Sequence, residues 1–288
     1  MKRGEGLLPA PKSPATSDRK APELMNSKAQ PSERSGGQRP LVPLAPHPPL
    51  HGYYGDGEGR QPFLNNLFDR TAYQYRNIDK ATGLGFGIWY RRRALELSGL
   101  SQGMCVLDVA CGPALVAQCA RDIVGASGVV VGLDPSIGML REARKGPCRT
   151  LVIGVGERLP FPDASFDFLS MGYALRHVSD LRAAFSEYYR VLKPGGVVLL
   201  LEICRPRSPL LISLSRFYIK TVLGIVFSAS TRNRDMKTLM DYWWDTTETC
   251  VQPDAIVGAL KDAGFSDCSE EQWFGGLLRD YRALKLRT

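Results

Sequence analysis

The sequence predicts an α/β fold: a doubly wound, mostly parallel sheet of seven strands, with a C-terminal β-hairpin and a cover of N-terminal helices. Two observations support this fold class. Strand-like and helix-like segments alternate five times between residues 101 and 204, which is typical of parallel sheets. The strand-like runs are rich in Val, Leu and Ile on both faces, as strands buried between two helical layers must be. Such sheets bind ligands at the carboxyl ends of their strands.

Residues 1–55 are predicted to form a disordered, proline-rich, basic tail. The first 50 residues contain eight Lys/Arg against four Asp/Glu, and ten of the chain's 20 prolines. With almost no aromatic residues and no apolar period, this segment has too little apolar surface to fold. Half of the chain's net charge of +8 therefore lies in a solvated tail. Because no aromatic residues interleave with the charges, no nucleic-acid partner is expected.

The start of the chain and its cysteines predict a cytoplasmic protein. The stretch "MKRGEGLLPAPKSPATS" has a basic start but lacks the apolar segment of a secretory signal peptide. The seven cysteines are scattered, with no CxxC pair and no His partner at metal spacing. We therefore expect reduced thiols, with neither disulfides nor a metal site.

A helical cover is predicted over residues 56–100, where apolar residues recur at helical spacing around a turn rich in glycine. The main domain is expected over residues 101–288. Its expected strands are 104–110, 128–134, 150–156, 165–174 and 195–204, and its expected helices are 113–125, 136–145, 179–192 and 253–263. Residues 264–287 have the pattern of the closing hairpin.

The most apolar stretch of the chain is residues 210–230. Arg216 and Lys220 in its middle, and its length, argue against a membrane span. The simplest interpretation is an amphipathic helix packed on the sheet. The alternative is a hydrophobic lid, or an interfacial helix that admits a lipid-soluble substrate.

The turn after the first strand, "DVACGPA" (108–114), is built of small residues. Small residues let a ligand approach the backbone, and the free N–H groups of the following helix attract an anionic group. Of the three glycines in a dinucleotide-binding G-x-G-x-x-G, the turn keeps Gly112 alone. Asp134, about twenty residues further on, ends the second strand and suits the two hydroxyls of a ribose. Two structural alternatives stay open: a close-packed turn without ligand, and a helix cap at Asp134.

Four motifs resemble those of class I S-adenosylmethionine-dependent methyltransferases: "VLDVACGPA", "GLDPSIGMLREAR", "LPFPDASFDFL" and "YRVLKPGGVVLLLEICRP". Together with "LFDRTAYQY", "YALRHV" and "AGFSDCSEEQWFGG", they make residues 62–288 similar, more narrowly, to the UbiE-type ubiquinone/menaquinone C-methyltransferases. The resemblance implies a Rossmann-like methyltransferase fold with S-adenosyl-L-methionine as the cofactor. It also implies methyl transfer to an aromatic or quinol carbon of a lipophilic substrate.

The resemblance further implies which residues bind the cofactor. They are Asp108, Ala110, Gly112, Asp134, Pro135, Met139, Glu157 and Tyr173. Asp108 is expected near the methionine end and Asp134 at the ribose hydroxyls, with Met139 or Ile137 beside the adenine. Where the family often has an acidic residue for the adenine amine, this chain has Val155, so Glu157 or a backbone amide is expected to replace it.

Arg176, His177 and Tyr75 are the expected catalytic residues. Carbon methylation of a hydroxylated ring needs a phenol to lose its proton and the ring hydrogen to leave afterwards, so a base near neutral pH fits. His177 titrates in that range, Arg176 can stabilise a phenolate, and Tyr75 can touch the ring. The structural alternatives are a helix-capping or surface histidine, a surface salt bridge from Arg176 to Asp180, and a packed aromatic ring at Tyr75.

Besides Val155, two positions at or next to the expected catalytic residues depart from the family pattern. His177 stands where the family usually has asparagine, and Arg76 follows Tyr75 where the family has aspartate. The departures keep three interpretations open: a quinol C-methyltransferase, an O- or N-methyltransferase of a small molecule, and a non-catalytic cofactor-binding partner in a biosynthetic assembly. "WYRRR" (89–93) leaves open a peripheral contact with an anionic membrane, and a homodimer also stays open.

Overall fold

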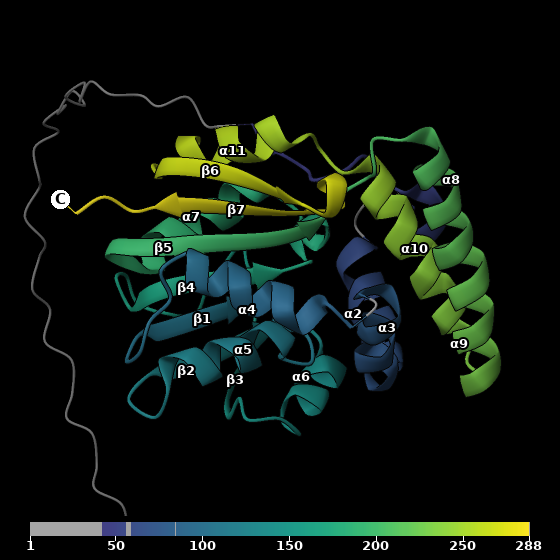
Figure 1. Cartoon of the computed structure of the whole chain (residues 1–288), viewed down its shortest axis with the longest axis horizontal. Helices are drawn as coiled ribbons and strands as arrows, with labels where there is room; N and C mark the ends of the chain where they lie inside the picture. Colours follow the sequence, from purple (N-terminus) through teal and green to yellow (C-terminus); the bar gives the residue numbers. More distant parts are fainter. Residues whose placement is uncertain (1–41, 56–58, 84, 288) are drawn as a thin grey trace, which may run out of the picture. The chain divides into compact units, whose positions relative to one another are not determined.

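A seven-stranded sheet forms the centre of the computed structural model (Figure 1), which describes residues 42–55, 59–83 and 85–287. The strands are β1 (Cys105–Val109), β2 (Val129–Asp134), β3 (Thr150–Ile153), β4 (Phe166–Gly172), β5 (Leu192–Ile203), β6 (Ser266–Trp273) and β7 (Leu278–Leu284). Their order in the sheet is β3-β2-β1-β4-β5-β7-β6. The first five strands are parallel, and β7 runs antiparallel to both β5 and β6. The predicted doubly wound sheet with a closing hairpin is confirmed.

Helices cover both faces of this sheet. On one face lie α4 (Gly87–Leu97), α5 (Leu115–Val124) and α6 (Ile137–Ala143), and on the other lie α7 (Leu181–Val191) and α11 (Pro253–Asp262). Alternate residues of β5 serve the two cores: Val198 and Leu200 pack with α7 and α11, whereas Leu199 and Leu201 pack with α4 and α5. Burial on both faces is why the strands lack polar alternation in the sequence.

The N-terminal segment is helical. Its helical segments are α1 (His51–Tyr54), α2 (Arg60–Thr71), a 3₁₀ turn (Ala72–Gln74), α3 (Tyr75–Gly83) and α4. α2 and α3 stand beyond the carboxyl ends of the parallel strands (Figure 1). They therefore close the side of the sheet at which doubly wound folds bind ligands.

Residues 42–55, expected to belong to the tail, instead pack on the domain. The N–H of Leu181 donates to the carbonyl of Leu44 at 2.9 Å, and the N–H of Val251 donates to the carbonyl of Pro46 at 2.7 Å. The expected tail boundary at residue 55 is therefore too late, because these contacts involve partners far away in the sequence. The rest of the predicted tail, residues 1–41, lies outside the described residues.

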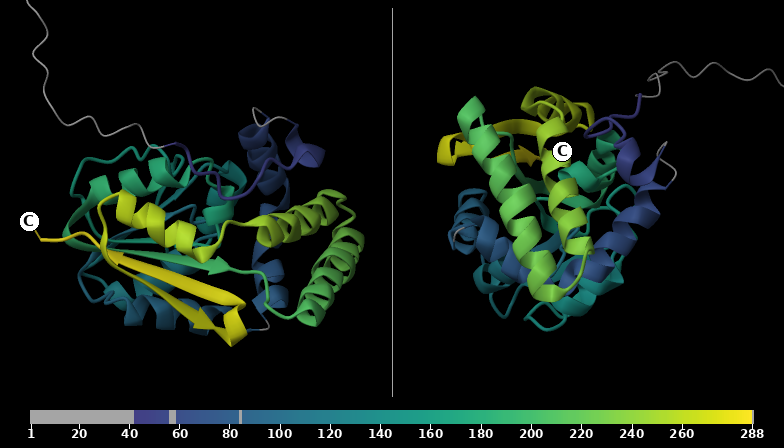
Figure 2. Two further views of the ribbon diagram at one scale, coloured as in Figure 1. Left: turned by 90° about the horizontal axis from the view of Figure 1, so that it is seen from above. Right: turned by 90° about the vertical axis from the view of Figure 1, so that its right-hand side faces the viewer.

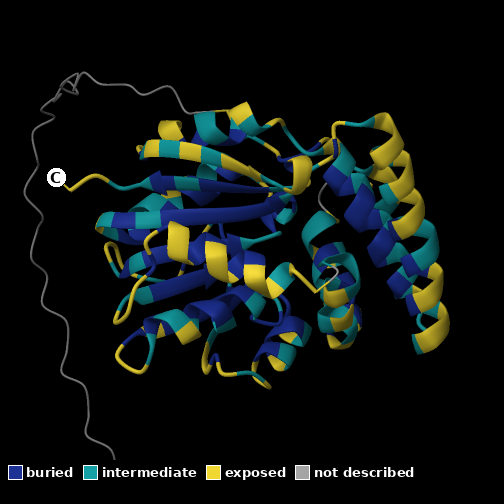
Figure 3. Cartoon of the chain, viewed as in Figure 1, coloured by how far each residue is buried: buried dark blue, intermediate teal, exposed yellow. Residues whose placement is uncertain are grey.

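The apolar stretch forms one continuous helix beyond the strand ends. It consists of α8 (Pro209–Arg216), a π-helical segment (Phe217–Leu223) and α9 (Gly224–Thr231), and the chain then returns as α10 (Asp235–Thr249). Figure 2 shows α8, α9 and α10 as a helical hairpin set against the rest of the domain. The expectation that this helix packs on the sheet is wrong, because other helices already cover both faces. Its inner side packs instead with α2, α3 and α10, and much of its outer side is exposed (Figure 3).

Candidate active site

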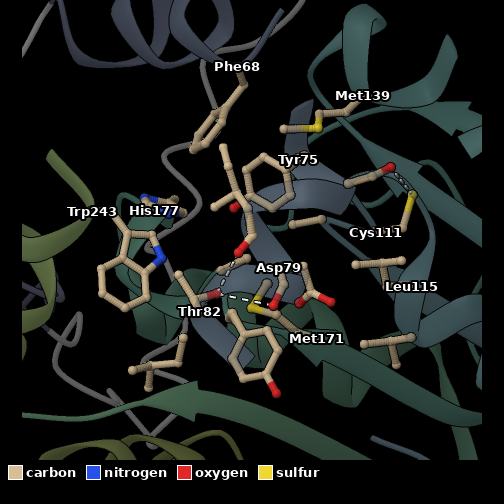
Figure 4. Close-up of a pocket in the computed structure, with 18 of the residues that line it drawn as sticks. Phe68, Tyr75, Asp79, Thr82, Cys111, Leu115, Met139, Met171, His177 and Trp243 are labelled. Atoms are coloured by element: carbon tan, nitrogen blue, oxygen red, sulfur yellow. Dashed lines mark hydrogen bonds between the residues drawn. The ribbon is translucent and has the colours of Figure 1, made fainter. Parts of the chain in front are cut away.

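A cavity of about 450 Å³ opens at the carboxyl ends of β1, β2 and β4. This volume falls within the range of about 300–1,000 Å³ that is usual for small-molecule sites. The walls come from the strand ends, α2, α3, the π-helical segment, α10 and the turn between β6 and β7. In Figure 4, Met139 and Cys111 lie on one side of the cavity, and Phe68, His177 and Trp243 lie on the other. Residues from the cofactor motifs and from the helical cover thus share one cavity.

The turn after β1 contributes Ala110 and Gly112 to the cavity wall. Its backbone is left-handed at Ala110 (φ 51°), Gly112 (φ 54°) and Ala114 (φ 63°). Two of these are alanines, for which this conformation costs about 1–3 kcal/mol and persists only where surrounding contacts impose it. A strained turn of small residues at the strand ends is a feature of ligand-binding loops.

Asp108 supplies part of that constraint from behind the turn. Its Oδ2 accepts the N–H of Ala117 in the first turn of α5 at 3.0 Å, and its Oδ1 accepts the hydroxyl of Ser170 at 2.7 Å. Burial raises the pKa of Asp108 to about 7. Asp108 is fully buried and does not line the cavity. The structure places its side chain behind the turn, as an anchor, and not in the cavity wall.

Asp134 ends β2 at the cavity wall. Its Oδ2 accepts the N–H of Gly112 and its Oδ1 accepts the N–H of Ser136, both at 2.8 Å. Burial raises the pKa of Asp134 to about 6, so the carboxylate is ionised at neutral pH, and each oxygen keeps a lone pair for another donor. The cap of α6 is Ser136, whose hydroxyl accepts the N–H of Met139 at 3.1 Å. The alternative of Asp134 as the helix cap is therefore wrong.

The residues expected around the adenine lie near Asp134. Pro135 and Met139 line the cavity, whereas Ile137 is exposed and does not, so Met139 is the one of the two candidates placed to flank a ring. Glu157 also lines the cavity, and its Oε1 accepts the N–H of Ser179 at 2.5 Å. This bond ties the loop after β3 to the segment after β4.

Tyr173 lines the cavity beside two charged residues, Asp79 and Arg91, that were not expected from the sequence. Its backbone is left-handed (φ 61°), and the guanidinium of Arg91 lies 4.9 Å from its ring centroid. Arg91 is buried and ion-paired with Asp79, with 3.2 Å between Nη1 and Oδ2. Asp79 and Arg91 both line the cavity. They come from α3 and α4, on either side of a glycine-rich turn, and no helical spacing links them in the sequence.

Arg176 is buried away from the cavity. Its guanidinium pairs with the equally buried Glu202 and lies 5.3 Å from the ring centroid of Trp243. Its side chain does not line the cavity, and it pairs with Glu202 and not with Asp180, so the expected salt bridge to Asp180 is wrong. Asp180 instead caps α7 by accepting the N–H of Arg182 at 3.0 Å.

His177, the next residue, does line the cavity, and so does Tyr75. The imidazole of His177 stacks on Tyr242 with 5.6 Å between ring centroids, and it meets the ring of Phe68 edge-on at 5.2 Å. Both ring nitrogens are buried and have no hydrogen-bond partner among the described residues. Burial lowers the pKa of His177 well below 6.5, with further contributions from nearby cations. The sequence suggested either a surface histidine or a group that titrates near neutral pH. In the structure His177 is neither, because its ring is buried and its pKa is lowered.

This lowered pKa predicts a pH-dependent stability. The unfolded chain binds a proton at His177 below pH ~6.5 and the folded chain does not, so the free energy of unfolding falls as pH falls, by about 1.4 kcal/mol per unit. The contribution of His177 is fully present above pH ~6.5. Urea unfolding of the wild type and of His177→Asn near neutral pH and near pH ~5 measures it. We expect a shallower loss in the variant, and parallel losses in the two proteins would contradict the prediction.

Arg60 of α2 clamps the segment that carries His177. Its Nη1 donates to the carbonyl of Val178 at 2.9 Å, and its Nη2 donates to the carbonyl of Arg176 at 3.0 Å. Because hydrogen bonds from a charged donor contribute about 1.5–3 kcal/mol each, we expect Arg60→Ala, which removes two of them, to lower the free energy of unfolding by roughly 3–6 kcal/mol. Arg92→Ala, which removes an exposed ion pair with Glu96, is the control and should change it by less than about 1 kcal/mol. Equal effects of the two substitutions would show that Arg60 is not a clamp.

α10 contributes aromatic wall residues that the sequence analysis did not assign. Trp243, Trp244 and Thr247 line the cavity opposite the cofactor motifs, together with Ile219 of the π-helical segment. The signal was present as "DYWWDTT" in α10. Aromatic residues on a helix usually pack in a core, however, and only the tertiary structure shows that these face a cavity.

The fold and the site together define a class I S-adenosylmethionine-dependent methyltransferase. Asp134, with unused lone pairs at the cavity wall, and the small-residue turn at Gly112 fit the ribose and the neighbouring part of this cofactor. Residues 57–285 match the model of the ubiE/COQ5 methyltransferase family. The chain belongs to this family, and the expectation of a methyltransferase that uses S-adenosylmethionine is confirmed.

Individual proteins agree with this assignment. Demethylmenaquinone methyltransferase of Staphylococcus epidermidis is 29% identical over 228 residues, which cover 77% of this chain and 92% of that protein. Among solved structures, an S-adenosylmethionine-dependent methyltransferase of Thermotoga maritima matches with a TM-score of 0.56 at 20% identity, covering 76% of this chain and 99% of the other. Phosphoethanolamine N-methyltransferase 2 of Haemonchus contortus, solved with S-adenosyl-L-methionine, matches with a TM-score of 0.53 at 20% identity. The match covers 77% of this chain and 60% of the other. At these identities the structural likeness shows the fold.

Proposed function

We propose that this enzyme transfers the methyl group of S-adenosylmethionine to a ring carbon of a lipophilic quinol. The observation that carries the proposal is the make-up of the cavity. A carboxylate and a small-residue turn lie at the ends of β1 and β2, and the same cavity is walled by Phe68, Ile219 and Trp243. Aromatic and aliphatic walls suit a flat ring with an apolar substituent. The relative's name, demethylmenaquinone methyltransferase, supports the same class of acceptor.

We assign roles to the chain's own residues as follows. Bound S-adenosylmethionine supplies a methyl group on a positively charged sulfur. Asp134 holds the ribose hydroxyls, and Met139 flanks the adenine. Since methyl transfer is an in-line displacement, alignment of the ring by the aromatic walls contributes most of the catalysis.

His177 faces the substrate side of the cavity as a neutral imidazole. A buried ring nitrogen without a partner accepts a hydrogen bond from a substrate hydroxyl, and this fixes which ring carbon points toward the methyl group. The low pKa disfavours an imidazolium beside Arg176. We therefore assign His177 to orientation of the hydroxyl, in place of the general base expected from the sequence, and the proton that the ring carbon loses on methylation would leave to solvent.

A substrate of this kind resides in lipid, so the proposal includes a cytoplasmic enzyme in peripheral contact with the membrane. Demethylmenaquinol is the first substrate to test, and a ubiquinone-type benzoquinol is the second. The O- and N-methyltransferase alternatives and the non-catalytic alternative become outcomes of the same test.

The test is incubation with S-adenosylmethionine labelled with ¹³C in its methyl group, followed by NMR of the extracted product. A new methyl carbon that correlates with quinone ring carbons supports the proposal. A methyl group attached to oxygen or nitrogen would establish one of the other transferases. No product, from a protein that binds S-adenosylhomocysteine, would favour the non-catalytic partner.

A further inference from the structure

The helix Pro209–Thr231 exposes more apolar surface than its composition leads one to expect. Its most apolar part has a mean hydropathy of 1.7, yet only 22% of that part is buried. By length and composition the helix could cross a membrane. The helix is thus long enough to span a membrane, contrary to the expectation from the sequence. The most exposed apolar side chains of its first half are Leu210 (68%), Leu211 (53%), Leu214 (54%) and Phe217 (61%). We call these four residues the α8 face.

The inner side of the same helix is tied to the domain. Lys220 pairs with Asp245 of α10 at 2.7 Å, and Arg216 pairs with Glu248 of α10. Ile219 is buried between α10 and the N-terminal helices. A helix held by ion pairs on one side and apolar on the other is suited to lying on a membrane surface, not to spanning the membrane.

The sequence around the α8 face is basic, and two of its six cations, Arg216 and Lys220, are paired with acidic residues of α10. Between Glu202 and Asp235 the sequence contains six Lys/Arg and no Asp/Glu. Arg205 and Arg207, just before α8, are exposed and form no ion pair within the described residues. A basic segment next to an exposed apolar helix complements an anionic lipid surface, to which each cation contributes about 1 kcal/mol.

The same charge argues against a second copy of the chain as the occupant. An isologous contact across the α8 face would bring two basic segments together, with no acidic residue between Glu202 and Asp235 to offset them. Anionic phospholipid has neither problem. It presents the opposite charge to Arg205 and Arg207, and it accepts the apolar side chains between its acyl chains.

The α8 face is continuous with the active-site cavity. Tyr218, next to Phe217, lines the cavity and is also exposed, as are Phe86, Phe274 and Leu277 at its rim. The rings of Phe86 and Phe274 lie 6.2 Å apart. Exposed apolar side chains thus extend from the outside of the helical hairpin to the rim of the cavity.

We propose that the α8 face, the basic residues before it and the apolar rim of the cavity form a docking surface for an anionic phospholipid membrane, through which the substrate enters. This inference rests on the proposed function for the identity of the substrate, but the docking itself does not depend on it. The contact is peripheral, with the sheet held above the lipid surface.

The test is cosedimentation of the full chain with vesicles of phosphatidylglycerol and phosphatidylcholine, and with vesicles of phosphatidylcholine alone. We expect binding to the anionic vesicles that weakens as salt is raised. Arg205→Ala with Arg207→Ala should weaken it roughly 30-fold, since two cations are lost. Leu211→Glu with Phe217→Glu should weaken it by about tenfold or more. The control Leu286→Glu adds a charge at a 50% exposed leucine beyond the end of β7, near the amino end of β5 and so at the opposite end of the strands from the cavity, and should bind like the wild type.

We call Leu211→Glu with Phe217→Glu the α8-face variant. Three results would overturn the docking surface: equal binding to both kinds of vesicle, equal effects of Leu286→Glu and the α8-face variant, or a wild-type dimer in lipid-free solution where the α8-face variant is a monomer. S-adenosylhomocysteine binding, measured by calorimetry, checks that each variant is folded. Turnover of a tailless, water-soluble quinol should be retained by the α8-face variant, while turnover of vesicle-borne quinol is lost. If the wild type turns over neither quinol but binds anionic vesicles, the proposed function fails and the docking surface stands.

Discussion

Asp134→Ala is expected to raise the dissociation constant for S-adenosylhomocysteine by roughly 100-fold or more. A carboxylate that accepts two ribose hydroxyls makes two charge-assisted hydrogen bonds, each worth about 1.5–3 kcal/mol, and about 2.8 kcal/mol corresponds to a factor of 100. These hydrogen bonds are charge-assisted only while the carboxyl group of Asp134 is ionised. Because burial raises the pKa of Asp134 to about 6, affinity should fall as pH falls below about 6, where the carboxyl group takes up a proton. Isothermal titration calorimetry measures both effects.

The controls for this prediction separate binding from folding. Asp134→Asn keeps an oxygen for the N–H of Gly112 or Ser136 but loses the charge, so we expect an intermediate loss of affinity. Asp163→Ala removes an exposed carboxylate that pairs with Arg190 and should leave binding unchanged. Wild-type affinity in a folded Asp134→Ala protein would mean that the ribose lies elsewhere in the cavity.

The second large effect is expected at the buried ion pair of Arg176 and Glu202. The side chains of both are 1% exposed. Glu202→Ala leaves a guanidinium buried without its counterion, which costs about 3–5 kcal/mol in the free energy of unfolding. Arg176→Met with Glu202→Leu removes both charges and fills the space with apolar atoms, so we expect it to recover most of that loss. Urea unfolding of the single and double variants measures the coupling.

The double variant also decides what Arg176 contributes to methyl transfer. Arg176 does not line the cavity, but it directly precedes His177 and contacts Trp243, both of which do. If Arg176 only positions His177 and Trp243, the folded double variant should bind S-adenosylhomocysteine normally. Its kcat for the quinol should then change more than its KM. A folded double variant with no turnover at all would return Arg176 to the catalytic role expected from the sequence. A stability loss below about 1 kcal/mol in Glu202→Ala would show that the pair is not buried in solution.

The sequence by itself determined the fold class and the cofactor side of the site. Parallel strands buried on both faces produce short, continuous apolar runs, and this signal is local, so the strand positions were predictable to within a few residues. Asp134 and the turn at Gly112 were predictable for a related reason. They directly follow strands, and the carboxyl ends of parallel strands meet at one edge.

Only the tertiary structure decided where neighbouring side chains point. Arg176 and His177 are adjacent in one 3₁₀ turn, yet one turns inward to Glu202 and the other faces the cavity. The difference is set by partners on β5, α2 and α10. The same holds for Asp79 and Arg91, which meet across a turn, and for the α8 face, which is exposed because other helices already occupy both faces of the sheet. The periodicity of a strand or helix can be recognised from a short stretch of sequence. The environment of a side chain, in contrast, depends on residues brought together from distant parts of the chain.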